Sequence, residues 1–111
     1  MTPMQTEQIL MATSEKATTA LKRQRLVNFQ GGQAGDGEAT LGTANADYSP
    51  GEQAGVNTHG SLLVEAGAAI AQGAQVQSDA QGRAITLASG VAAGRTRDAA
   101  TAAGEIIRIM R

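Results

Sequence analysis

A chain of 111 residues has the length of a single domain, and a domain of that size buries only about two-thirds of the surface that its unfolded chain exposes. Hydrophobic residues make up 41% of the sequence, but 22 residues are alanine and only Phe29 and Tyr48 are aromatic, so the core must be thin. The lack of cysteine excludes disulfides, thiolate metal sites and cysteine nucleophiles, and no apolar run is long enough to cross a membrane.

The net charge of -1 is unevenly distributed along the chain. Residues 36–79 contain six acidic residues and no basic one, whereas residues 1–25 and 83–111 are both net basic. This pattern is typical of solvated faces, or it indicates contacts in which the basic ends of one copy meet the acidic middle of its neighbour. A near-neutral chain with few aromatic side chains lacks the charge and the stacking surface needed to bind nucleic acid.

The first 20 residues contain no glycine and follow neither the strand nor the helix period, so we expect an N-terminal arm or a short, weak helix. The arm precedes a β domain that spans residues 21–111. Methionine adapts to irregular surfaces, and apolar residues of the arm are therefore candidate contacts with a partner surface or with another subunit. These residues are Met4, Ile9, Leu10 and Met11.

Basic residues supply further candidate contacts at two places in the chain. Lys22, Arg23 and Arg25 form a cluster that is either a solvated strand start or an anchor for an acidic patch on a partner. Arg95 and Arg97 belong to the basic C-terminal region, and we expect them to take part in contacts between copies.

From Gln24 onward, short apolar runs alternate with turn signals about every ten residues, which predicts an all-β fold. We expect a small β-barrel or β-sandwich of about eight short strands with an extended N-terminal arm. The predicted strands are Gln24–Phe29, Ala39–Ala44, Gln53–Thr58, Ser61–Glu65, Gln75–Ser78, Arg83–Ala88, Val91–Thr96 and Glu105–Met110.

The clearest hairpin joins Val76 to Leu87, because Asp79 and Gly82 occupy the first and fourth positions that a type I turn prefers. The alanine-rich stretch Glu65–Gln77 could instead form a helix. Two glycines in this stretch each cost a helix about 1 kcal/mol relative to alanine, so we expect turns there, with Ile70 and Val76 pointing inward.

The chain also contains an internal similarity. Residues 42–56 and residues 94–109 each run from a small strand through an aspartate and a turn to Gly-Glu and a second strand. Aspartate can cap its own turn, and glycine gives the backbone the freedom to enter the next strand. Two similar half-units predict a pseudo-symmetric β fold.

No constellation of residues predicts catalysis, a cofactor or a metal ion. His59 is the single histidine, and no serine has the surroundings of an activated nucleophile, so we interpret His59 as a surface or interface residue. The loop of residues 31–37 lacks the oxygen ligands of a calcium site and the lysine of a phosphate loop. We therefore expect no catalytic, cofactor-binding or metal-binding residue.

A succession of small motifs carries a resemblance to a known family. The motifs are residues 62–76, Asp79-Ala80-Gln81-Gly82-Arg83-Ala84, residues 89–94, Asp98-Ala99-Ala100 and residues 104–109. In this order they resemble the C-terminal half of the capsid decoration, or cement, proteins of tailed bacteriophages, long catalogued as a domain of unknown function. The preceding Leu41-Gly42, Asp47 and residues 51–56 extend the resemblance to about residues 21–111.

The resemblance implies a structural virion protein that is made in the host cytoplasm and binds the exterior of a phage head. It implies that the partner is the major capsid protein, that the lattice is stabilised against internal pressure, and that there is no catalysis. We also expect self-association, as a homotrimer in preference to a dimer, and no binding of nucleic acid or membrane. Alternatives are a small β binding module of a phage tail or baseplate, a carbohydrate-recognition domain and, third, an enzyme.

Overall fold

The computed structural model describes residues 6–111, which form eight β-strands and no helix. The described part therefore has no helix that could cross a membrane. The strands are β1 (Gln8–Lys16), β2 (Leu26–Asn28), β3 (Thr40–Ala44), β4 (Gln53–Glu65), β5 (Gln75–Ser78), β6 (Ala84–Thr86), β7 (Gly94–Thr96) and β8 (Ile106–Met110).

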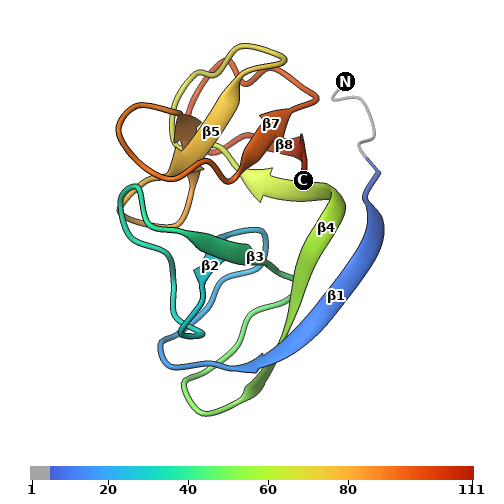
Figure 1. The fold of residues 1–111 in the computed structure, drawn as a ribbon, viewed down its shortest axis with the longest axis vertical. Helices are drawn as coiled ribbons and strands as arrows, with labels where there is room; N and C mark the ends of the chain where they lie inside the picture. Colours follow the sequence, from blue (N-terminus) through green and yellow to red (C-terminus); the bar gives the residue numbers. More distant parts are fainter. Residues whose placement is uncertain (1–5) are drawn as a thin grey trace.

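The strands form one antiparallel sheet that curls into a nearly closed barrel. Their order is β2-β3-β4-β8-β7-β5-β6, and β1 pairs with β4 outside this path. The two ends of the path meet where the N–H of Leu26 donates to the carbonyl of Gly82 in the β5–β6 turn, at 2.7 Å. Figure 1 shows β4 as a long curved strand, with β1 alongside it and β5, β7 and β8 above β2 and β3. The predicted all-β barrel is confirmed.

The strand predictions are close to the observed elements, with two differences. Residues 53–58 and 61–65 form a single strand, β4, because Gly60 takes a φ of +120° and lets the chain continue through the bend. Residues 8–16, which lack strand periodicity, nevertheless form β1 because they pair with β4 along their whole length. Such pairing supplies backbone hydrogen bonds whatever the side-chain pattern.

The turn predictions for the second half of the chain are confirmed. Oδ1 of Asp79 accepts hydrogen bonds from the N–H groups of Gln81 and Arg83, at 2.8 and 2.9 Å, and so caps the β5–β6 turn. Gly82 closes that turn with a φ of +73°. Residues 66–74 form turns rather than a helix, and both Ile70 and Val76 are buried.

The chain contains two copies of one backbone unit, residues 8–57 and residues 57–110. The N–H of Gly51 donates to the carbonyl of Ala17 at 2.7 Å, and the N–H of Gly104 donates to that of Ala66 at 2.8 Å. The strand pairs also correspond residue by residue. In the first unit the pairs run from Lys16↔Gln53 to Ala12↔Asn57, and in the second unit the matching pairs run from Glu65↔Ile106 to Ser61↔Met110. The predicted pseudo-symmetry is therefore present, and it extends to residues 17–27 and 66–76.

The core is divided in the same way. One cluster of buried residues belongs to the first unit and consists of Ala17, Leu21, Val27, Ala44, Ala54 and Val56. The larger cluster includes the second unit's counterparts, Ala66, Ile70, Val76, Ile107 and Ile109, and also Leu26, Leu62 and Val64. Small side chains fill both clusters, which agrees with the thin core predicted from the composition.

Candidate functional site

A row of side chains crosses the second unit on the face of the sheet that points away from its core. Residues that pair directly in an antiparallel sheet carry their side chains on the same face. The pairs Gln75↔Arg95, Arg95↔Met110, Met110↔Ser61 and Ser61↔Gln8 therefore define one continuous row over β5, β7, β8, β4 and β1. We call these five residues the outer row.

Most of the matching row of the first unit is covered. Its residues Leu26, Thr43 and Asn57 pair in the same register and are all buried. In the outer row, by contrast, Gln75 and Arg95 are exposed and 48% of Met110 is exposed to solvent. The face of the second unit is therefore open at Gln75, Arg95 and Met110, where the equivalent residues of the first unit are buried. At the fourth position the contrast is reversed, since Ser61 is buried and its equivalent, Ala12, is exposed.

A β-bulge in β1 brings Leu10 to the edge of the outer row. The pairing of β1 with β4 shifts register between Ile9 and Met11 and again between Met11 and Ala12. Bulges re-aim side chains, and here 76% of Leu10 is exposed. Gly60 makes this approach possible, since a Cβ atom at that position would lie 2.2 Å from the carbonyl oxygen of Gln8 and 2.9 Å from the nitrogen of Leu10.

Together these residues form a shallow groove of about 450 Å³. Its lining is Gln8, Leu10, Gly60, Ser61, Arg97 and Met110. Arg97 donates from Nη1 to the hydroxyl oxygen of Ser61 at 3.1 Å, which fixes a cation beside the apolar side chains. The groove therefore suits a ligand surface that combines an apolar side chain with a carboxylate.

Two further arginines lie on the same face. Arg95 donates from Nη1 to the carbonyl of Gly73 at 2.7 Å. Arg108 donates from its backbone, from Nε and from Nη2 to the carboxylate of Asp98, at 2.9, 2.9 and 2.8 Å. These hydrogen bonds lower the pKa of Asp98, so its charge persists at neutral pH and partly offsets the basic character of the face.

The structure brings together some of the predicted contact residues and separates others. Leu10 and Arg97 share the groove, and Arg95 lies in the outer row. Ile9 and Met11 flank Leu10 and are exposed, but neither lines the groove. Lys22 and Arg23 are exposed near the start of β2, and the N–H of Arg23 donates to Oδ1 of Asp47 at 2.8 Å. Met4 lies outside the described residues.

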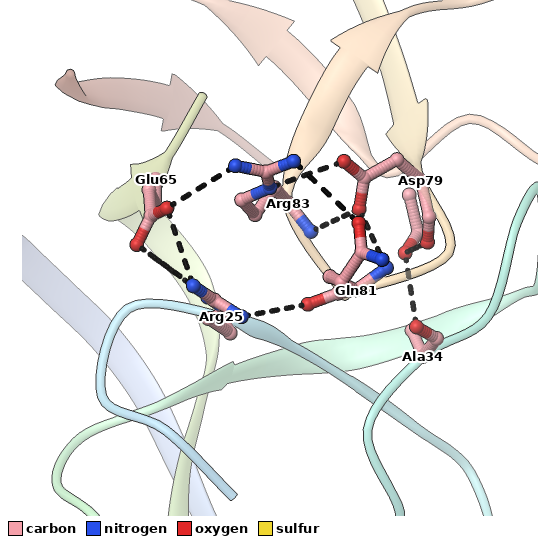
Figure 2. A network of polar contacts seen from close by, with 7 residues as sticks. Arg25, Ala34, Glu65, Asp79, Gln81 and Arg83 are labelled. Atoms are coloured by element: carbon pink, nitrogen blue, oxygen red, sulfur yellow. Dashed lines mark hydrogen bonds and ion pairs between the residues drawn. The ribbon is translucent and has the colours of Figure 1, made fainter. Parts of the chain in front are cut away.

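Arg25 takes part in a network within the molecule. Its Nη2 lies 3.3 Å from Oε2 of Glu65, which is also 3.7 Å from Nη1 of Arg83, and Arg83 pairs with Asp79. Figure 2 shows these groups spanning from β4 to the β5–β6 turn, where Arg25 also donates to the carbonyl of Gln81. The network joins the two units, so Arg25 has partners within its own chain.

The described residues contain no group of three or more His, Asp or Glu side chains that could hold a metal ion. His59 is exposed, and its Nδ1 lies 3.1 Å from the hydroxyl oxygen of Thr58 rather than near a carboxylate.

Sequence reasoning missed three residues of the outer row, of which Gln8 and Met110 are exposed and Ser61 is buried. Strand alternation predicts the position of Met110. Because Ile107 and Ile109 are buried, the side chain of Met110 lies on the opposite face of β8. Phe29 and Val91, which are 59% and 52% exposed, were also not predicted as surface residues.

Comparisons with known proteins agree with this description. The chain resembles the head fiber gp8.5 N base of bacteriophage phi29, with a TM-score of 0.74 and 18% sequence identity over 90% of this chain and 92% of that one. At that identity the likeness establishes the fold. No individually curated protein matches the chain significantly. The model of the phage cement protein family matches residues 4–111. The chain therefore belongs to the phage cement proteins, a family of structural proteins rather than enzymes.

Proposed function

We propose that this protein binds the outer surface of a phage head and stabilises the lattice of the major capsid protein. Membership of the cement family supports this role, as does the fold shared with a head fiber base. The protein would then lie on the exterior of the virion, where many copies meet the same repeating surface.

The observation that carries the proposal is the exposed apolar segment of β1. Ile9, Leu10 and Met11 are consecutive and exposed, although nine residues of strand hold their backbone in place. Exposed apolar patches of this kind mark interaction sites in soluble proteins. Full burial of each side chain on a partner contributes on the order of 1.5–3 kcal/mol, and each 1.4 kcal/mol changes the dissociation constant tenfold. We assign Ile9 and Met11 to the contact with the capsid.

We further propose that copies associate with one another, as a homotrimer in preference to a dimer. The open face carries Arg95 and Arg97, whereas Asp36, Asp47 and Glu52 are exposed in the first unit. Each exposed ion pair contributes only about 0–1 kcal/mol, but a symmetric assembly repeats the same contact at every boundary. Replacement of both arginines by glutamate should reduce the oligomer size and its sensitivity to salt while the monomer stays folded.

Binding to undecorated heads tests the proposal. The double variant Ile9→Ser/Met11→Ser should bind heads at least about tenfold more weakly than the unchanged protein, because it loses two buried apolar contacts. Val91→Ser is the matched control, since it also removes an exposed apolar side chain but lies in the segment between β6 and β7. Equal binding by all three proteins would exclude Ile9 and Met11 from the contact, and binding to tails instead of heads would contradict the proposed function.

A further inference from the structure

The fold of a single chain leaves the aromatic side chain of Phe29 outside its core. It follows β2 in a turn, belongs to neither core cluster and is 59% exposed. Among the large hydrophobic side chains that the described residues leave exposed, Phe29 is the aromatic one. Its position at the tip of a turn makes it a protruding group.

A carboxylate lies close to the turn that carries Phe29. The amide of Asn28, the residue before Phe29, donates to both carboxylate oxygens of Glu38, at 3.2 and 3.3 Å. The N–H of Gly35 donates to the same carboxylate at 2.8 Å. These hydrogen bonds, that from Gly35 foremost, lower the pKa of Glu38, so the group is ionised at neutral pH. Asp36 is exposed in the same loop.

The Leu10–Met110 groove has the complementary character, an apolar floor flanked by Arg97 and Arg95. The two features lie at opposite ends of β1. Gly31, two residues after Phe29, accepts a hydrogen bond from the N–H of Thr18 at 3.0 Å, just beyond the C-terminal end of β1. Leu10 lies six residues before Lys16, which corresponds to about 20 Å of extended strand. Phe29 and the groove of the same chain therefore cannot meet.

We infer that Phe29 of one copy inserts into the Leu10–Met110 groove of a neighbouring copy, where Glu38 faces Arg97. The inference rests on the proposed arrangement of copies side by side on a head and names the surface through which they touch. The contact joins two different patches, so it is heterologous and generates a ring when the rotation between copies closes. Charge complementarity fixes its direction, since the acidic end of each copy meets the basic face of the next.

Cysteine pairing tests this contact directly, because the sequence contains no cysteine. The variants Phe29→Cys and Leu10→Cys are mixed as purified proteins in a glutathione redox buffer, without heads. The yield of the mixed disulfide should be about ten times the yield from Leu10→Cys mixed with Val91→Cys. Val91 is exposed, as Phe29 is, but the proposed contact brings only Phe29 close to Leu10. Equal yields from the two mixtures, or a predominance of Leu10→Cys homodimers, would overturn the inference.

Reversal of the two charges, one on each copy, provides a second test. Arg97→Glu in the Leu10→Cys protein should lower the yield of the mixed disulfide, and Glu38→Lys in the Phe29→Cys partner should restore it. A loss that the second substitution leaves unrestored in folded proteins would show that Glu38 does not face Arg97. Head binding by each single variant is measured separately. If the disulfide test fails while the protein still binds heads, only the contact between copies is overturned. If the unchanged protein does not bind heads, the proposed function is overturned.

Discussion

Leu21 and Ile70 occupy the same position in the two units of the chain. Leu21 exchanges two backbone hydrogen bonds with Tyr48, at 2.9 and 3.0 Å, and Ile70 exchanges two with Ala100, both at 2.9 Å. Each side chain is buried in the core cluster of its own unit. The barrel is thus assembled from a repeated backbone unit, and these two equivalent residues lie in separate core clusters.

Separate cores predict that substitutions in the two clusters act independently. Leu21→Val and Ile70→Val should each lower the free energy of unfolding by about 0.5–1.5 kcal/mol. The double variant should show the sum of the two effects within about 0.5 kcal/mol, because distant sites without shared partners are additive. Urea unfolding of the four proteins measures this. A larger coupling would show that the clusters behave as one core.

Gly60 should be required for β1 to lie against β4. Gly60→Ala should lower the free energy of unfolding by at least about 1–2 kcal/mol, since it combines a positive φ with a Cβ atom placed 2.2 Å from the oxygen of Gln8. Gly51→Ala is the matched control, because Gly51 has a φ of +91° but open space around its Cβ position. The difference between the two variants isolates the steric contribution, and similar losses would argue against a close approach of β1 at Gly60.

The Asp98–Arg108 pair should stabilise the fold in a pH-dependent manner. The hydrogen bonds from Arg108 lower the pKa of Asp98 in the folded state below its unfolded value of about 3.9. The resulting stability is present in full above that unfolded value and is lost as the pH falls through the folded pKa. Asp98→Asn should lower the free energy of unfolding by about 1 kcal/mol at pH 7, a value that allows for screening by solvent.

Thermal melting at a series of pH values gives the comparison. The difference between the unchanged protein and Asp98→Asn should shrink as the pH falls below about 4, where both side chains become neutral. A constant difference from pH 7 to pH 2 would show that the variant acts through packing rather than through the charge of Asp98.

The proposed division into an N-terminal arm and a β domain predicts a tolerated truncation. We place the cut after Lys16, because Ala17 is buried in the first core cluster and its N–H donates to the carbonyl of Glu52 at 2.8 Å. The shortened protein should fold with reduced stability, since most β1 side chains are exposed, and should lose attachment to heads. Circular dichroism and a binding assay measure the two effects. An unfolded product would place β1 in the core, and unchanged binding would place the contact elsewhere.

Much of the barrel could be predicted from the sequence because its turns carry local signals. Asp79 and Gly82 specify the β5–β6 hairpin, and the Gly-Glu pairs at residues 51 and 104 precede two strands of the repeated unit. β1 could not be predicted in this way, since its strand conformation depends on pairing with β4 rather than on its own side-chain pattern. The groove was beyond sequence reasoning for the same reason, because Leu10, Ser61 and Met110 meet only through the register of three strands.

A titration of undecorated heads with the purified protein tests whether the protein acts as a cement for phage heads. The number of copies bound per shell, counted by quantitative gel analysis or by cryo-electron microscopy, should reach a plateau fixed by the lattice. At saturation the heads should release their DNA at a higher temperature than undecorated heads do. Failure to bind, binding without a plateau, or saturation with unchanged heat resistance would contradict this account.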